Sequence, residues 1–146
     1  MARRLLREGG LFLNHGITSS DTGNREVGLG AGQFIARYVF PEGELPHLHV
    51  VAREMSDAQL EVHDVECLRT HYAKTLELWS GNFERSLAGA IAASSERTAR
   101  IWRLYLAGCA HAFEQRWVSI YQILGSRQTQ PGRARLPLTR DWMYAD

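Results

Sequence analysis

Val62 to Trp79 reads VHDVECLRTHYAKTLELW, and this stretch joins the end of a strand to an amphipathic helix. Val62 and Val65 flank Asp64, whose carboxylate can cap the free amides of a helix that begins next to it, and Glu66 adds negative charge to the first turn. Beyond this cap, apolar side chains recur in steps of three and four, which predicts one apolar helical face. These side chains are Leu68, Tyr72, Leu76, Trp79, Phe83 and Leu87.

The elements before this stretch alternate between helix and strand. Residues 33–40 predict a short helix that Pro41 ends, because proline cannot continue a helix. Residues 48–55 have the spacing of a second amphipathic helix, and residues 60–62 predict the next strand. This alternation is typical of an α/β fold.

After the central stretch, a second long helix is predicted from the cap residues Ser94 and Ser95 through Arg116. Its apolar positions are wider than one stripe, which indicates burial on most sides. A glycine in its interior, Gly108, favours close helix packing at that point. Residues 117–124 are rich in β-branched and aromatic side chains and predict a strand.

The N-terminal part begins with a tight turn at residues 8–10, followed by the apolar strand Leu11 to Leu13, of the kind buried on both faces in a parallel sheet. Residues 18–33 are polar and glycine-rich, which predicts a flexible loop. Its Gly28 to Gly32 segment superficially matches a GxGxG cofactor turn, but no apolar strand leads into it, so a connector or lid is the better interpretation. Residues 128–146 predict a loose C-terminal tail, and residues 1–146 a single domain.

Bulk composition excludes some classes of function. A chain of 146 residues with 45% hydrophobic composition can form one domain at the smaller end of the usual range. A formal net charge of +1 gives no electrostatic argument for nucleic acid. The 17 basic residues are all arginine except Lys74, which suits an anionic lipid surface and is equally explained by codon bias in a GC-rich genome.

The cysteines and the hydropathy pattern indicate a cytoplasmic protein. Cys67 and Cys109 match no CxxC pattern, and buried thiols in a reducing cytosol are the simplest interpretation. No apolar run approaches the roughly 20 residues that span a bilayer. The start, MARRLLREGG, lacks the apolar core of a signal peptide. We therefore expect the protein either free in the cytoplasm or peripheral at the inner membrane surface.

Two residues are candidates for chemistry by their positions. His15 follows an apolar strand directly, and ligands bind beyond the carboxyl ends of strands in open α/β sheets. A surface histidine at a strand exit explains His15 equally well. Tyr72 lies on the apolar face of the predicted helix, together with Leu68 and Leu76. The simplest interpretation is a core tyrosine whose hydroxyl forms a hydrogen bond inside the protein.

Histidine and arginine clusters carry less information. His47 and His49 form an HxH pair, but His63 and His71 do not complete a set of metal ligands at a defined spacing, so no metal site is predicted. Arginines recur every three residues in the second long helix and could face lipid phosphates or form an ordinary solvated face. They are Arg97, Arg100 and Arg103.

Four blocks of sequence, in order, resemble the cyclopropane-fatty-acyl-phospholipid synthases, lipid methyltransferases that include the mycolic acid cyclopropane synthases. The blocks are residues 38–46 (YVFPEGELP), 62–79, 101–113 (IWRLYLAGCAHAF) and 136–144 (LPLTRDWMY). The resemblance covers nearly the whole chain but only the C-terminal part of the family's length. It implies the C-terminal portion of a class I S-adenosylmethionine-dependent methyltransferase, an α/β Rossmann-like fold, lacking the N-terminal strands. Residues 8–13 resemble the start of that fold's fifth strand, although the family usually has proline where Glu8 stands.

The resemblance also implies a reaction. A methyl group from S-adenosylmethionine is added to a cis-unsaturated phospholipid acyl chain, and bicarbonate removes a proton so that a cyclopropane ring closes or a methyl branch remains. His15 with the backbone at Ile17 matches a his-x-ile motif that binds bicarbonate, and Tyr72 matches a his-tyr-ala-x-thr-leu motif that does the same. A glutamate and a cysteine that complete this site in the family have no counterpart here, and no residue of this chain is assigned to the cofactor.

The resemblance leaves an alternative open. The chain can be a non-catalytic module that binds lipid or another subunit, completed by a separate N-terminal half or by a second copy of itself. Because the cofactor-binding strands are not in this sequence, we expect the isolated chain to be weakly active or inactive.

Overall fold

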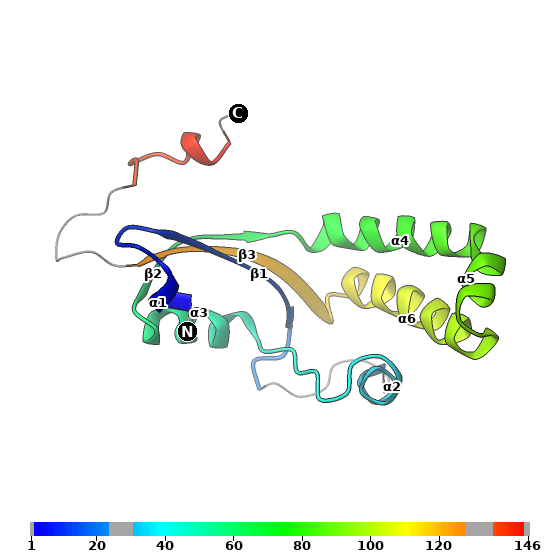
Figure 1. Cartoon of the computed structure of the whole chain (residues 1–146). Helices are drawn as coiled ribbons and strands as arrows, with labels where there is room; N and C mark the ends of the chain where they lie inside the picture. Colours follow the sequence, from blue (N-terminus) through cyan, green and yellow to red (C-terminus); the bar gives the residue numbers. More distant parts are fainter. Residues whose placement is uncertain (1, 24–30, 128–135, 145–146) are drawn as a thin grey trace.

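The computed structural model describes residues 2–23, 31–127 and 136–144. A three-stranded sheet forms one end of the molecule, and a long helical hairpin extends from the other end (Figure 1). The elements in chain order are α1 (Ala2–Leu5), β1 (Leu11–Ser19), α2 (Ala31–Tyr38), α3 (Leu48–Asp57), β2 (Leu60–Cys67), α4 (Arg69–Arg85), α5 (Leu87–Ala93), α6 (Glu96–Glu114), β3 (Val118–Arg127) and the 3-10 turn η1 (Asp141–Met143).

The sheet is antiparallel, with strand order β1-β3-β2. β3 is central, and Ile120 pairs with Ile17 of β1 while Ile123 pairs with Val65 of β2. The expectation that Leu11 to Leu13 form a strand of a parallel sheet, buried on both faces, is wrong for the described residues. β1 pairs along its length with the antiparallel β3, a parallel contact occurs only as an isolated bridge between Ser19 and His47, and Leu13 is 54% exposed. The alternate residues Leu11, Leu13 and His15 point to one face of the sheet and are exposed there.

Each face of the sheet carries its own core. Ile120 and Ile123 lie three residues apart on β3 and therefore point to opposite faces. On one face Ile120 packs with Leu76 of α4 and Phe113 of α6. On the other face Ile123 packs with Met55 of α3 and Leu60 at the start of β2. The sheet thus separates the helical hairpin from α3 (Figure 1).

Residues 62–79 form the predicted strand and helix, but the start of the helix differs from the prediction. β2 continues to Cys67, and α4 begins at Arg69 with no side-chain hydrogen bond at its N-cap, so Asp64 does not cap the helix. The β-branched residues Val62 and Val65 extend the strand, because they pair along β3. The Asp64 carboxylate instead forms an ion pair with Arg140, at 2.8 Å.

The second long helix is confirmed as α6, capped by Ser95, whose hydroxyl accepts a hydrogen bond from the amide of Thr98. Burial on most sides is wrong, because α6 packs on α4 through one face and Leu104 is 64% exposed. Close packing at Gly108 is also wrong, since a Cβ there would meet no heavy atom within 4 Å.

The remaining expectations fall partly outside the described residues. The helices predicted at 33–40 and 48–55 and the strands predicted at 60–62 and 117–124 are present as α2, α3, β2 and β3. The predicted loop 18–33 is shorter than expected, because Thr18 and Ser19 end β1 and residues 31–33 begin α2. Residues 24–30, with most of the glycine-rich segment, and residues 128–135 of the tail lie outside the described part of the chain.

Candidate functional site

An apolar cavity of about 690 Å³ lies between α2, the turn that follows it, and α6. Ile17 of β1 and Val118 of β3 close its inner end. The other lining residues are Phe34, Ile35, Val39, Phe40, Pro41, Glu42, Gly43, Glu44, Leu45, Leu104, Tyr105, Gly108, Cys109, Ala112 and Phe113. The cavity therefore combines an apolar interior with two carboxylates in the turn.

Aromatic contacts and one glycine shape this cavity. The rings of Phe40 and Tyr105 meet edge to face with centroids 5.9 Å apart, which joins the turn to α6. The Trp102 ring meets Tyr105 in the same way at 5.4 Å. Gly108 leaves space where any other residue would place a side chain. α2 ends at Tyr38, and Pro41 lies in the turn that follows it. Glu42, the next residue, has a positive φ of 63°, and the chain turns around the cavity there.

The two polar groups inside the cavity are neutral at physiological pH. Burial raises the pKa of the Tyr105 hydroxyl well above its ordinary value, and the neighbouring Cys109 adds to this rise. Burial also raises the pKa of the Cys109 thiol, although a hydrogen bond with Tyr105 opposes the rise. The charges on the lining residues are consequently those of Glu42 and Glu44 in the turn.

The structure brings two of the three predicted site residues to this region. Ile17 lines the cavity, and Tyr72 packs against the same core cluster, with its ring centroid 5.0 Å from that of Phe113. The described residues offer the Tyr72 hydroxyl no hydrogen-bond partner. His15 lies two residues before Ile17 on β1 and is exposed, and its side chain makes no hydrogen bond or ion pair with the described residues. His15 does not line the cavity.

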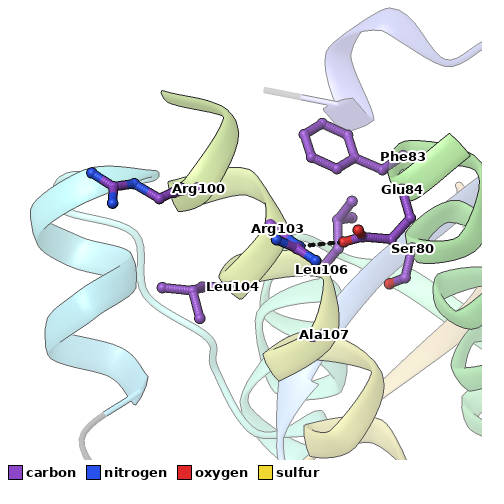
Figure 2. A pocket seen from close by; sticks show the side chains of 8 residues that line it. All are labelled: Ser80, Phe83, Glu84, Arg100, Arg103, Leu104, Leu106 and Ala107. Carbon is purple, nitrogen blue, oxygen red and sulfur yellow. Dashed lines mark hydrogen bonds and ion pairs between the residues drawn. The ribbon is translucent and has the colours of Figure 1, made fainter. Parts of the chain in front are cut away.

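A second hollow, of about 430 Å³, lies between α4 and α6 and contains two of the three repeating arginines (Figure 2). The guanidinium of Arg103 binds the Glu84 carboxylate at 2.5 Å, so its charge is already neutralised within the hairpin. Arg100 points away from that pair (Figure 2). This arrangement favours a solvated helix face over a phosphate site.

The histidines do not gather into a metal site. The Nδ1 atoms of His47 and His49 lie 2.8 Å apart, and His63 shares a hydrogen bond with Ser126 at 2.7 Å. Among residues 2–23, 31–127 and 136–144, no three side chains of His, Cys, Asp or Glu are grouped to hold a metal ion. Within the same residues, none of the helices has the length and apolar character needed to cross a membrane.

The two cysteines have different environments. Cys109 is partly buried, whereas Cys67 is exposed, so the expectation of two buried thiols is wrong for Cys67. Partial burial raises the pKa of the Cys67 thiol, but hydrogen bonds from Ser119, the Arg69 amide and Tyr121, together with the Arg69 charge, outweigh it. The pKa of Cys67 therefore lies below its ordinary value.

We expect Cys67 to react with iodoacetamide faster than Cys109. The lowered pKa gives Cys67 the larger thiolate fraction, and burial both raises the pKa of Cys109 and shields it. Peptide mass spectrometry after timed alkylation at pH 8 gives the two rates separately. Equal rates in the folded chain would contradict the structure at these positions, and unfolding in guanidinium should remove the difference.

A family model described as Mycolic acid cyclopropane synthetase matches residues 1–123 of the chain. The chain belongs to this family. A probable fatty acid methyltransferase of Pseudomonas putida is 56% identical to this family member over 139 residues, which are 95% of the chain and 35% of that relative.

Solved structures agree with the family assignment. The cyclopropane synthase MmaA2 of Mycobacterium tuberculosis superposes with a TM-score of 0.79 at 27% identity, covering 86% of this chain and 47% of that one. The mycolic acid cyclopropane synthase CmaA1, complexed with SAH and CTAB, has a TM-score of 0.76 at 32% identity, with the same coverage. This member of the family thus spans about a third to a half of these relatives' length. It has the C-terminal portion of the Rossmann-like S-adenosylmethionine-dependent methyltransferase fold.

The apolar cavity between α2 and α6 of this family member was not predicted from the sequence. Residues 38–46 and 101–113 were recognisable only as blocks of resemblance, not as opposite walls of one space. One signal was present: apolar residues on α6 cover more than the stripe that α4 can bury. That excess includes Leu104 and Tyr105, which line the cavity instead of entering the core.

Proposed function

We propose that the chain supplies the acyl-binding part of an S-adenosylmethionine-dependent methyltransferase that acts on unsaturated acyl chains of phospholipids. The apolar cavity between α2 and α6 is the observation that carries this proposal. Its volume of about 690 Å³ falls within the range of small-molecule sites. A hydrocarbon chain is the ligand that gains most from such walls, because apolar burial contributes about 25 cal/mol per Å².

The products that we propose are a cyclopropane ring or a methyl branch, with bicarbonate as the base. Relatives named fatty acid methyltransferase and cyclopropane synthase support lipid methylation, and a relative complexed with SAH supports the cofactor. S-adenosylmethionine supplies an electrophilic methyl group when bound. We assign no residue of this chain to the cofactor, because the described lining residues are apolar side chains and carboxylates.

Tyr72, His15 and the backbone at Ile17 are the proposed bicarbonate ligands. The unpartnered Tyr72 hydroxyl and the free His15 imidazole suit this role, because both can donate hydrogen bonds to an oxyanion. Ile17 and Tyr72 belong to the same core cluster, so the proton-accepting oxygen would lie beside the acyl cavity. The apolar walls would keep water from a cationic intermediate on the lipid.

We further propose that the protein works at the inner surface of the cytoplasmic membrane, and that β1 pairs there with a strand from an N-terminal half or from a second copy. Exposed apolar residues support contact with lipid, among them Leu78 and Trp79 on α4 and Leu104 on α6. The position of β1 at the edge of the described sheet supports strand addition, because an edge strand presents backbone N–H and C=O groups that a further strand can pair with.

One observation favours a second candidate function. β1 is an edge strand of the described sheet, and described residues line the apolar cavity. A non-catalytic module that binds lipid or a subunit would need only the cavity and that edge. Lipid binding without any bicarbonate-dependent methylation of oleoyl phospholipid, measured by the mass gain of the acyl chain, would favour the module.

We expect Gly108→Leu to weaken acyl binding by tenfold or more, that is about 1.4 kcal/mol. A Cβ atom at this position would meet no heavy atom within 4 Å, and because Gly108 lines the cavity, the leucine side chain would occupy it. Helical stability should rise, since glycine costs about 1 kcal/mol relative to good helix formers. Displacement of a fluorescent polyene fatty acid by oleate measures the affinity, and thermal unfolding measures the stability.

The matched control is Gly89→Leu. Gly89 also lies in a helix with open space around its Cβ position, but it does not line the cavity. We expect this control to keep full acyl affinity. Unchanged binding in Gly108→Leu would show that the hydrocarbon lies elsewhere.

A further inference from the structure

A third cavity, of about 260 Å³, lies at the end of the sheet and has a very different lining. It is enclosed by the end of β1, the start of α3, the junction of β2 with α4, and the turn between α6 and β3. The lining residues are Thr18, Ser19, Ser20, His47, Leu48, Cys67, Arg69, Arg116, Val118, Ser119 and Tyr121. We call this space the end cavity.

The end cavity has the composition of an anion site. Its lining includes two arginines, Arg69 and Arg116, as well as His47, several hydroxyl groups and a thiol. No carboxylate belongs to the described lining, in contrast to the apolar cavity with its two glutamates. Positive charge without a compensating carboxylate favours an anionic ligand.

A buried hydroxyl group points to the same conclusion. Thr18 is only 3% exposed, and its Oγ1 atom has no hydrogen-bond partner among the described residues. A buried hydroxyl without a partner costs about 1 to 3 kcal/mol, so such a group normally meets a ligand or water. Because Thr18 lines the end cavity, a ligand bound there can accept this hydrogen bond.

The cationic side of the end cavity is held in place by the fold. The Arg69 guanidinium donates a hydrogen bond to the carbonyl oxygen of Phe113 at 2.6 Å, which fixes the start of α4 against the end of α6. Ser119 lies 3.4 Å from the Cys67 sulfur, measured from its Oγ atom. The Arg69 charge also reaches Cys67, where it lowers the thiol pKa. The site is therefore positively biased before any ligand binds.

We propose that the end cavity binds a phosphate group, with Arg69 and Arg116 as cationic ligands and the Thr18 hydroxyl as a hydrogen-bond donor. A tetrahedral oxyanion can accept from guanidinium and hydroxyl donors on several sides at once. The phosphate group can belong either to a lipid headgroup or to free phosphate. This site shares only Val118 with the described lining of the acyl cavity and does not depend on the proposed methyl transfer.

The reactivity of Cys67 reports phosphate binding in the end cavity, so the proposal can be tested without an enzymatic assay. A phosphate next to the thiol should raise its pKa, which lowers the thiolate fraction and slows alkylation by about threefold or more at saturation. We would titrate inorganic phosphate at constant ionic strength, with chloride as the balancing anion, and follow iodoacetamide alkylation by peptide mass spectrometry. Cys109, in the other cavity, is the internal reference. We expect saturable protection of Cys67 and none of Cys109.

Two variants test the assigned ligands. Arg116→Asn removes the charge while tolerating the positive φ of 61° at this position, and Thr18→Val removes only the unpartnered hydroxyl. Both should weaken the protection by phosphate. The matched control is Arg97→Asn, an exposed α6 arginine that does not line the end cavity and should leave protection unchanged.

Vesicles distinguish the two sources of phosphate. We would compare phosphatidylcholine vesicles with vesicles that also contain phosphatidate, each with and without Arg116→Asn. Protection by phosphatidate vesicles alone, lost in the variant, supports a lipid headgroup, and protection by inorganic phosphate supports a free ligand. Protection by neither, or protection that Arg116→Asn leaves intact, would overturn the proposal.

Discussion

Tyr72→Phe should reduce acyl methylation by about 100-fold or more, the range expected when a group that positions the general base is lost. The change removes the hydroxyl that has no partner among the described residues and keeps the ring contacts with Phe113 and Trp79. We would assay the chain in its complete methyltransferase, with oleoyl phospholipid and a series of bicarbonate concentrations. A bicarbonate ligand predicts a weaker apparent affinity for bicarbonate as well as a lower rate.

The control for this result is Tyr105→Phe. Tyr105 also carries a partly buried hydroxyl near the acyl cavity, but it belongs to no bicarbonate motif. We expect this variant to keep its bicarbonate dependence. Thermal unfolding should be nearly unchanged in Tyr72→Phe, because no described hydrogen bond is lost. A Tyr72→Phe enzyme with a normal rate and normal bicarbonate affinity would remove Tyr72 from the proposed site.

Phe113→Ala should lower the free energy of unfolding by about 3 to 5 kcal/mol, the usual cost of deleting a buried phenyl ring. Phe113 is only 2% exposed, and it contacts the Tyr72 ring in the cluster that joins α4, α6 and β3. Removing the ring leaves a void between the hairpin and the sheet. Urea unfolding followed by tryptophan fluorescence gives the midpoint and the slope.

Trp102→Ala is the comparison for this stability experiment. Trp102 is also an aromatic residue of α6, but it is exposed and lies outside the buried cluster. We expect a much smaller loss of stability, because less apolar area leaves the core. Equal losses in the two variants would mean that α6 packs through a different face from the one described.

Local patterns in the sequence predicted most helices and strands. The three- and four-residue spacing placed Leu76 correctly on the buried face of α4, whereas Trp79 is 48% exposed and Leu87 belongs to α5. Ser95 correctly marked the start of α6. Pro41 marked the end of the short helix before the turn. These features depend on neighbours within one or two turns of the chain, which is why one sequence is sufficient to find them.

Features that depend on distant partners were not accessible in this way. Asp64 appeared to be a helix cap because its true partner, Arg140, is far away in the sequence. The pairing direction of β1 was predicted wrongly, because the residues Leu11 to Leu13 do not indicate that their neighbour is the antiparallel strand β3. The apolar cavity joins α2 to α6, and the end cavity joins four separate segments, so neither appears in any local pattern. Position along the sequence singled out His15 and Tyr72, and the family resemblance added Ile17 and the proposed bicarbonate role.

The central position of β3 has a consequence for synthesis on the ribosome. Leu11 pairs with Ser126, so the start of β1 is synthesised about 115 residues before its described partner. At translation rates of about 5 to 20 residues per second, this interval lasts about 6 to 23 seconds. β1 and β2 do not pair with each other, so both strands lack their described partner until β3 emerges. Slower translation should therefore lengthen the time for which the edges of β1 and β2 are open to aggregation.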